Sequence, residues 1–247
     1  SLLASLIQVP AALILEKPLG IHAEDVAPLV EKVERDGRYA AVIFVNRMLP
    51  IWRAAKELDA AGRLGCPCYA HFRLINGPPS RYQRDGVGWM LDAGQSGGGS
   101  LINLGTHTLD AFRQFTGEDV RVVSAQLGNA VHGQTIEDYS VAILRSSSGA
   151  LASVESGYCY AAMAGGDQEW RLITSNAYLV QRNDALLVQT LDDGKLQTLP
   201  GLSPAEAYHM FIAESRRRFR HGEPPIATMR DGLKVLELVN DIYRLAQ

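Results

Sequence analysis

A run of short apolar segments between residues 120 and 199 constrains the fold of this chain more than any other feature. Turn signals separate the segments: Ser-Ser-Gly at 147–149, Asn-Asp at 183–184 and Asp-Asp-Gly at 192–194. Short turns of this composition join antiparallel neighbours. We therefore predict an antiparallel meander, with strands over Val120–Val131, Glu137–Arg145, Ala150–Tyr160, Glu169–Ser175, Ala177–Arg182, Leu186–Leu191 and Lys195–Leu199.

Side chains along these strands alternate between the two faces of the sheet. Ala152, Val154 and Tyr158 share one face, while Leu151 and Glu155 share the other. Neither face is cleanly polar, as the solvent-facing side of an antiparallel sheet would be, and monomers rarely expose large apolar patches. We therefore expect helices to cover one face. A second copy of the chain is expected to cover the other, through a two-fold, self-complementary interface that makes a homodimer or a larger homo-oligomer.

The first 46 residues follow a different pattern. Short, almost wholly apolar segments over Ala11–Leu15 and Tyr39–Asn46 lie on either side of an amphipathic helix predicted over residues 20–36. Such strands are typical of a parallel sheet covered on both faces. A sheet of that kind needs more than two strands, so we interpret residues 1–46 as the remnant of a larger α/β unit. The predicted class is α+β: a predominantly antiparallel open sheet with helices on one face, preceded by a β-α-β remnant.

The sequence indicates where each of the two C-terminal helices begins. Ser203 with Glu206, and Thr228 with Asp231, have the N-cap and N3 spacing of a capping box. We expect the last helix over 228–246 and expect it to pack back on the first 46 residues. Apolar residues recur along it at helical spacing: Leu233, Leu236, Val239 and Ile242.

Between these parts, we predict helices over Pro50–Ala61 and Ser100–Phe115 and a long strand over Cys66–Asn76. Residues 77–99 read as an irregular connection, rich in glycine and proline. Long connections inside compact domains usually carry function.

Composition excludes several classes of partner. The chain has 247 residues, with 24 Lys and Arg against 27 Asp and Glu, and a formal net charge of −3. A nucleic-acid-binding protein would usually show a basic stripe, and no apolar run is long enough to span a bilayer. The three cysteines lack the spacing of a metal site and indicate reduced thiols. We expect a cytoplasmic protein with a small-molecule substrate, and no metal, nucleic acid or membrane partner.

Glu16-Lys17-Pro18 follows the first apolar strand directly. In parallel α/β sheets, ligands bind beyond the carboxyl ends of the strands. The position therefore favours a ligand-binding role for Lys17. An isolated Glu-Lys-Pro is more often just a solvent-facing lysine at a strand end, so the tripeptide by itself leaves both interpretations open.

A polar stripe marks the helix that follows Gly97-Gly98-Gly99. Asn103, His107 and Asp110 lie four and three residues apart, so they can form one cluster on a helix face. A histidine flanked by two groups able to orient it is an acid/base candidate. The glycines allow close backbone approach, and the helix start favours an anionic or hydroxyl-rich ligand. An exposed polar face after a flexible loop explains the pattern equally well.

Taken in order, these motifs resemble those of the glucose-fructose oxidoreductase / inositol dehydrogenase (Gfo/Idh/MocA) family. The resemblance rests on Glu16-Lys17-Pro18, Asn46-Arg47-x-x-Pro50, Gly97-Gly98-Gly99 with His107 and Asp110, Ile136-Glu137-Asp138 and Asp231-Gly232-Leu233. It implies an NAD(P)-dependent oxidoreductase that transfers hydride between the nicotinamide and a sugar, polyol or related hydroxylated molecule. Residues 1–46 would be a remnant of its Rossmann domain, and residues 47–247 its substrate-binding and oligomerisation domain.

The resemblance also implies residue roles. Lys17, His107 as the acid/base, and Asn103 would be catalytic; Glu16, Lys17 and Pro18 would contact the cofactor; Arg47, Trp89 and Asp110 would contact the substrate.

Two departures from the family pattern matter. Many members carry aspartate where this chain has Asn103, and an amide cannot stabilise an imidazolium as a carboxylate does. No G-x-G-x-x-G turn follows an early strand. We therefore expect a full-length parent to use NAD or NADP, and this chain alone to bind it weakly and to be inactive. The alternative is a non-catalytic binding or assembly module that retains the fold.

Overall fold

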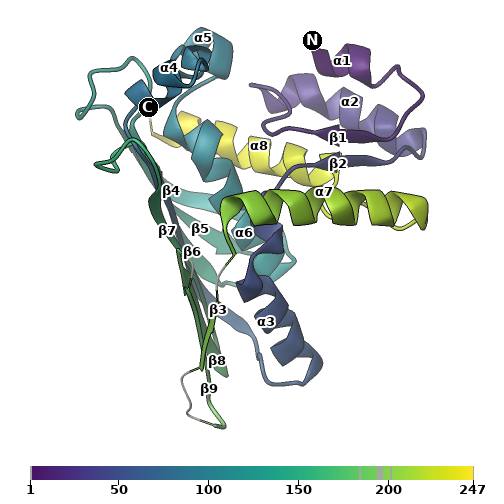
Figure 1. Ribbon diagram of the computed structural model, residues 1–247, viewed down its shortest axis with the longest axis vertical. Coiled ribbons are helices and arrows are strands. Elements are labelled where there is room, and N and C mark those ends of the chain that lie inside the picture. The colour runs from purple at the N-terminus through teal and green to yellow at the C-terminus, as the bar shows by residue number, and fades with distance from the viewer. Residues whose placement is uncertain (1, 184, 194–196, 201, 247) are drawn as a thin grey trace.

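A computed structural model describes residues 2–183, 185–193, 197–200 and 202–246. An open sheet stands with helices against one of its faces, and a small α/β unit adjoins the helical side (Figure 1). The helices are α1 (Leu2–Leu6), α2 (Ala23–Arg35), α3 (Pro50–Ala60), α4 (Ser80–Arg84), α5 (Ala93–Ser96), α6 (Thr106–Thr116), α7 (Pro204–Arg220) and α8 (Met229–Leu245). Two 3-10 turns, η1 (Val45–Met48) and η2 (Gly88–Leu91), and a π-helical segment, η3 (Leu101–Gly105), complete the helical elements.

The large sheet has the strand order β10-β9-β8-β7-β3-β6-β5-β4. Its strands are β3 (Pro67–Asn76), β4 (Val120–Gly128), β5 (Tyr139–Ser146), β6 (Leu151–Gly157), β7 (Gly166–Thr174), β8 (Ala177–Arg182), β9 (Ala185–Thr190) and β10 (Gln197–Pro200). Every neighbouring pair is antiparallel except β3 and β6. The predicted α+β class is confirmed. Of the predicted turn and strand residues, Asp184, Gly194, Lys195 and Leu196 lie outside the described residues.

The prediction of one continuous meander is wrong at its centre. β4 to β6 and β7 to β10 are two meanders, and β3 lies between them, parallel to β6 and antiparallel to β7. Residues 158–165 connect β6 to β7 across the end of β3, where the amide of Tyr160 donates to the carbonyl of Asn76. A connection of this length can step over one strand, whereas a tight turn cannot.

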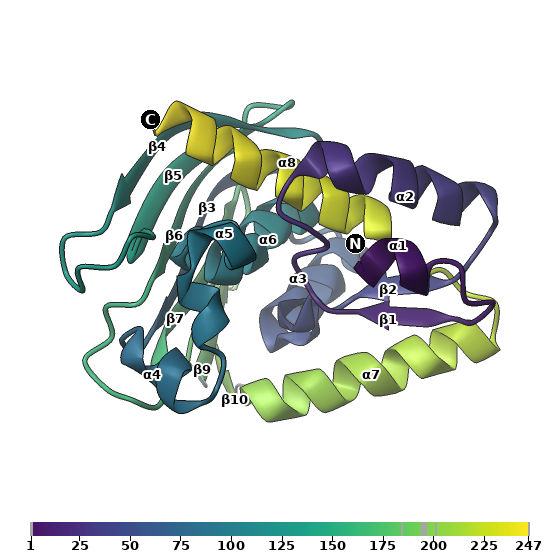
Figure 2. The same ribbon diagram turned by 90° about the horizontal axis from the view of Figure 1, so that it is seen from above.

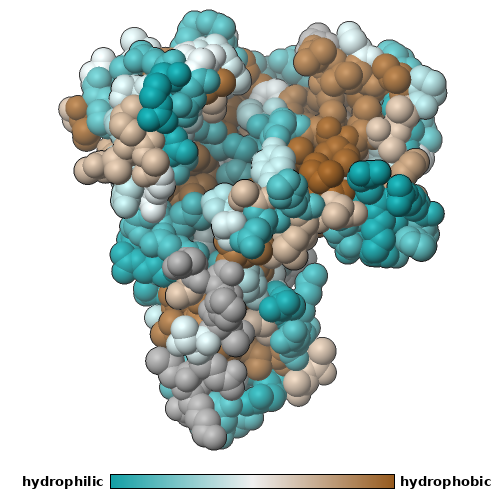
Figure 3. All heavy atoms as spheres, in the orientation of Figure 1, coloured by the Kyte–Doolittle hydropathy of each residue, from teal (hydrophilic) through white to brown (hydrophobic). Residues whose placement is uncertain are grey.

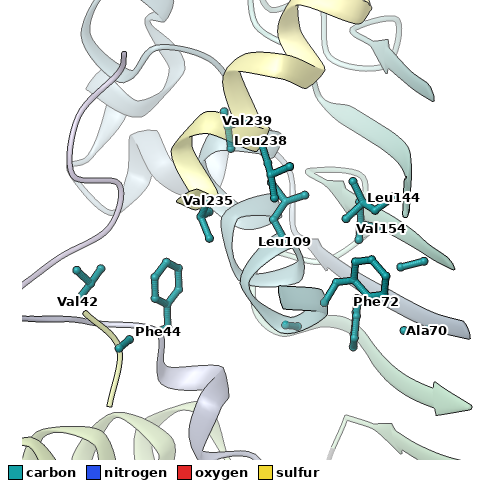
Figure 4. Packing of buried hydrophobic residues seen from close by; sticks show 14 of the residues in the cluster. Val42, Phe44, Ala70, Phe72, Leu109, Leu144, Val154, Val235, Leu238 and Val239 are labelled. Carbon is teal, nitrogen blue, oxygen red and sulfur yellow. The ribbon is translucent and has the colours of Figure 1, made fainter. Parts of the chain in front are cut away.

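The predicted alternation of side chains along the strands is confirmed. Ala152, Val154 and Tyr158 are buried on the helical side, while Leu151 on the opposite face is 40% exposed. The central side chains of the helical side belong to one hydrophobic core (Figure 4), in which Phe72 of β3 and Leu109 of α6 are fully buried. This packing fixes α6, which carries the predicted acid/base, against the middle of the sheet.

The N-terminal unit shares that core. β1 (Leu13–Leu15) pairs in parallel with β2 (Ala40–Val42), and α2 connects them. Helix α8 runs beside α2 (Figure 2), and the side chain of Asn240 accepts from the amide of Ala23 and donates to the carbonyl of Ile21. Asn240 therefore supplies a hydrogen-bond acceptor to the first amide of α2, because the N-cap residue His22 makes no side-chain cap.

Two predicted segments differ from the structure. The apolar run over 39–46 is a strand only as far as Val42 and then turns into η1, because apolar content alone does not distinguish a strand from a buried helical turn. Residues 77–99 contain α4, η2 and α5 rather than irregular chain alone. Turns of four or five residues are too short to show a helical period.

Both predicted capping boxes at the C-terminal helices are confirmed. Within the part of the chain that the structure describes, no helix combines the length and apolar character needed to cross a membrane.

Candidate active site

Lys17 lies two residues beyond the end of β1, and its side chain reaches the π-helical segment η3. Its Nζ donates to the backbone carbonyl of Asn103 and lies 3.4 Å from the side-chain Oδ1 of the same residue. Burial lowers the pKa of Lys17 to about 8, and the carboxylate of Glu16 opposes that shift. Two motifs that are 86 residues apart in sequence therefore meet at one amine.

Glu16 does not form an ion pair with Lys17. Its Oε1 accepts a hydrogen bond from the hydroxyl of Tyr208 on α7, and partial burial raises the pKa of its carboxyl. Among the described residues, no carboxylate oxygen lies within 4.0 Å of the Lys17 amine. The acceptors that contact Lys17 are thus the neutral oxygens of Asn103.

Asn103 is held by two tyrosines. Its Nδ2 donates to the hydroxyls of Tyr82 and Tyr158, at 3.2 and 3.0 Å. The two rings lie 5.0 Å apart, and burial raises the pKa of both hydroxyls, so they stay neutral. With the amide nitrogen held in this way, Oδ1 faces Lys17. π-Helical turns are rare and are frequent at functional sites.

His107 lies at the start of α6, one turn after Asn103. Its ring packs edge-on against Phe44, with 6.1 Å between ring centroids, and its Nδ1 is buried without a hydrogen-bond partner. Burial, and then the positive charge of Lys17, hold the pKa of His107 well below its ordinary value. The imidazole is therefore neutral near pH 7.

The predicted cluster of Asn103, His107 and Asp110 is not held together by hydrogen bonds in the described part of the chain. Asp110 instead binds Arg47 in a bidentate pair, at 2.8 and 2.6 Å. Arg47 also donates to the carbonyl of Ile226 and lies 3.3 Å from Asp231 at the start of α8. These contacts use every guanidinium nitrogen and join η1, α6 and α8. The predicted substrate contacts of Arg47 and Asp110 remain predictions.

A cavity of about 450 Å³ opens beside Lys17. It lies in the hollow between the lobe of α4 and α5 and the lobe of α1 and β1 (Figure 3). Its walls are Glu16, Lys17, Pro18, Gly20, Ile21, Trp89, Met90, Gln95, Ser96, Gly98, Gly99, Ile102 and Asn103. The structure thus brings together Lys17, Asn103, Trp89 and the glycine-rich loop. Among the residues it describes, neither Arg47 nor His107 belongs to this wall.

A larger and more open hollow, of about 910 Å³, lies between the start of α2 and the end of α8. Its lining includes His22, Glu24 and Glu237 but none of the predicted site residues. We therefore take the smaller cavity as the candidate active site, because the amine of Lys17 lies on its wall.

The glycine-rich loop Gly97-Gly98-Gly99 was expected to approach a ligand, but in the structure it contacts another part of the chain. The carboxylate of Glu137 accepts from the amides of Gly99 and Leu101, at 3.0 and 2.9 Å, and the hydroxyl of Tyr243 donates to it at 2.9 Å. The anion at this helix start is thus part of the chain, not a ligand. A Cβ on Gly99 would lie 2.1 Å from the Glu137 carbonyl oxygen, so the close approach that requires glycine is to the protein itself.

Tyr82, Tyr158 and Tyr243 are site residues that no sequence motif singles out, whereas Glu137 lies in the motif Ile136-Glu137-Asp138, to which we assigned no site role. Tyr158 could have been predicted in part, because the alternation of side chains along the predicted strand Ala150–Tyr160 places it on the same face as Ala152 and Val154. Tyr82 and Tyr243 approach the site from segments far apart in sequence, and local patterns carry no information about such contacts.

Comparison with known proteins decides the family. Residues 52–180, just over half the chain, match the family model described as the GFO/IDH/MocA C-terminal domain. The chain belongs to the GFO/IDH/MocA family. The resemblance carried by the sequence motifs is thereby confirmed.

Relatives and solved structures agree with this placement. The chain is 27% identical to 1,5-anhydro-D-fructose reductase from Ensifer adhaerens, over 88% of this chain and 65% of that protein. It is 26% identical to myo-inositol 2-dehydrogenase from Thermotoga maritima, over 90% and 66%. The fold is similar to that of levoglucosan dehydrogenase in complex with NADH, with a TM-score of 0.88 at 18% identity, over 99% of this chain and 74% of that one. The chain thus spans about two thirds of the length of these curated relatives.

Proposed function

We propose that this chain is the substrate-binding part of an NAD(P)-dependent oxidoreductase that acts on a sugar, a polyol or a related hydroxylated small molecule. One observation carries the proposal: Lys17, a partly buried amine with no carboxylate oxygen within 4.0 Å among the described residues, lies on the wall of a cavity of substrate size. Relatives named as a sugar reductase and a polyol dehydrogenase support the same chemistry.

The cavity wall fits the nicotinamide end of the cofactor. Glu16, Lys17 and Pro18 would hold that end, because Pro18 offers an apolar surface beside the polar amine. The nicotinamide, when bound, accepts or supplies a hydride. We propose that residues 1–46 belong to the nucleotide-binding domain and residues 47–247 to the substrate domain. The apolar surface around α1 and β1, with Val9 and Ile14 exposed, supports this division (Figure 3).

The substrate would lie against Trp89 and reach Lys17. Trp89 is 51% exposed at the rim of the cavity, where its ring is available to stack on the apolar face of a sugar. Lys17 lines the same cavity and can bind a hydroxyl oxygen. Asn103 positions that amine, and the two tyrosines position Asn103.

The test is turnover by the full-length protein with a panel of sugars and polyols and with both NAD and NADP. We expect at least one hydroxylated substrate to be oxidised, and Lys17→Met to abolish that turnover. Lys234→Met, which removes an exposed lysine of α8 that pairs with Glu237, should leave it unchanged. Retained sugar binding without turnover by the wild type would support the alternative, a non-catalytic binding module.

A further inference from the structure

We propose that Glu137 and Tyr243 are positioning residues for the candidate active site: together they hold the glycine-rich loop and the start of η3, which form part of the cavity wall. The inference rests on the proposed oxidoreductase function. It deepens that function by naming two residues outside the wall on which turnover depends.

A single residue, Glu137, binds three consecutive amides of this segment. Its carboxylate accepts from the amides of Gly99 and Leu101, at 3.0 and 2.9 Å. Its backbone carbonyl accepts from the amide of Ser100, at 3.1 Å. Residues in and around this run of amides line the cavity: Gly98, Gly99, Ile102 and Asn103. The position of this part of the wall therefore depends on Glu137.

The carboxylate of Glu137 is buried without a cation. The residue is 7% exposed, and no Lys, Arg or His nitrogen of the described residues lies within 4.0 Å of its carboxylate. Burial raises its pKa, and the hydrogen bonds from the loop amides and from Tyr243 oppose that shift. A buried charge is costly unless hydrogen bonds compensate it, and bonds to an ionised acceptor are stronger than neutral ones. Glu137 therefore holds the loop more firmly than a neutral side chain would.

Tyr243 of α8 supplies a further hydrogen bond. Its hydroxyl donates at 2.9 Å to Oε1 of Glu137, the oxygen that also accepts from the loop amides. Burial and the neighbouring carboxylate raise the pKa of Tyr243, so the hydroxyl keeps its proton and remains a donor. The same hydroxyl lies directly against the loop, because a Cβ on Gly98 would be 1.8 Å from it.

The loop borders a second hollow as well as the candidate cavity. This hollow, of about 400 Å³, has Gly97, Gly98, Glu137 and Tyr243 in its lining, and Gly98 also lines the candidate cavity. Protein interiors are normally close-packed, so open space on a second side leaves the loop room to move. The hydrogen bonds to Glu137, supported by Tyr243, keep it in place.

Helix α8 holds a second part of the cavity wall. Asn240, three residues before Tyr243, donates to the carbonyl of Ile21 and accepts from the amide of Ala23. Ile21 lines the same cavity. One turn of α8 therefore fixes a wall segment of the N-terminal unit and, through Glu137, the glycine-rich loop. A misplacement of about 1 Å in an active site can lower a rate about 100-fold.

Tyr243→Phe tests the proposal, because it removes only the hydroxyl that donates to Glu137. In the full-length protein we expect kcat to fall about tenfold or more, as for a misplaced reacting group. KM for the dinucleotide should change by less than about threefold, because uniform binding is retained. Tyr160→Phe makes the same chemical change on an exposed ring outside the cavity wall and should leave kcat unchanged.

Variants of Glu137 separate positioning from stability. Glutamine keeps one acceptor oxygen without the charge, so Glu137→Gln should retain more of the wild-type kcat than Glu137→Ala. Since Tyr243 acts through Glu137, adding Tyr243→Phe to Glu137→Ala should lower kcat further by less than about threefold. Fully additive losses contradict the proposal. So does a folded Tyr243→Phe that unfolds at a lower temperature with unchanged kcat, because the pair would then have only a structural role.

A second readout does not depend on turnover or on the variants of Glu137. Hydrogen–deuterium exchange of the full-length protein, measured by mass spectrometry, follows the peptide that contains residues 97–103. We expect exchange there to be about tenfold faster in Tyr243→Phe, the effect of weakening hydrogen bonds to a charged acceptor. Tyr160→Phe should exchange at the wild-type rate. Equal rates in the wild type and Tyr243→Phe overturn the inference.

The outcomes also separate the two proposals. Wild-type turnover that Tyr243→Phe leaves unchanged contradicts the present inference alone. Absence of turnover by the wild type with every substrate and both cofactors contradicts the proposed function, and this inference with it.

Discussion

Lys17 and Arg47 are both partly buried cations, yet their pKa values shift in opposite directions. Burial lowers the pKa of Lys17 to about 8, and the oxygens that it contacts are neutral. Arg47 contacts Asp110 and Asp231; although burial opposes the effect, these carboxylates raise its pKa further above the ordinary value. An amine with a lowered pKa can exchange protons, whereas a permanently charged guanidinium joins the elements that carry its partners.

We expect Asp110→Asn to destabilise the fold by about 3 kcal/mol or more, because it leaves the buried Arg47 charge without its bidentate partner. Urea unfolding followed by circular dichroism measures this free energy. Asp192→Asn, which removes a partner of the exposed Arg63, should change the free energy of unfolding much less, because water screens an exposed ion pair. Equal losses in both variants would contradict a structural role for the Arg47–Asp110 pair.

Among the elements, the π-helical segment η3 has the largest influence on the candidate site. It carries Asn103, and its start is held by the carboxylate of Glu137 from the loop before β5. Tyr243 of α8 donates to the same carboxylate. The position of Asn103 therefore depends on contacts from the sheet and from the last helix.

Gly99→Ala should disturb this arrangement. A Cβ there would lie 2.1 Å from the carbonyl oxygen of Glu137, a backbone atom that cannot turn away. We expect a loss of about 1–3 kcal/mol in unfolding free energy, typical of overpacking. Gly128→Ala at the end of β4, where a Cβ would meet nothing within 4 Å, is the control. A neutral Gly99→Ala would show that Glu137 does not constrain the loop.

At the scale of the whole molecule, no helix of the described residues lies against one face of the large sheet (Figure 1). Leu151 and Val141 are exposed on it. We propose that this face binds a second copy of the chain. Sedimentation velocity should show a dimer or a larger oligomer, and Leu151→Glu with Val141→Glu should give monomers, because the charges would have to be buried without partners. Leu245→Glu, at the exposed end of α8, should not. A wild-type monomer at high concentration would refute the proposal.

Cofactor affinity is a second property of the whole molecule. The chain contains no glycine-rich phosphate-binding turn after an early strand, and that turn supplies much of the affinity for a dinucleotide. Titration calorimetry of this chain with NADH should therefore give a Kd weaker than about 1 µM, or a binding free energy weaker than about −8.2 kcal/mol. The full-length protein is the positive control. Micromolar or tighter binding by this chain would show that its own residues suffice.

The sequence by itself determined the features that depend on near neighbours. The capping boxes at Ser203 and Thr228 and the side-chain alternation along β6 are correct, because each follows from residues a few positions apart. The sequence also placed Lys17 just beyond the end of an apolar strand, as the structure has it. These signals sufficed for the α+β class and for the family.

Only the tertiary structure decided which distant groups meet. β3 lies between β6 and β7, and no turn signal records this order, because the pairing joins strands that are far apart in sequence. Asp110 binds Arg47 rather than orienting His107, since the guanidinium of η1 lies within reach of its carboxylate. The meeting of Lys17 with Asn103 likewise arises from packing. Local sequence patterns specify short-range geometry, whereas the partners of a buried polar group depend on how whole elements pack together.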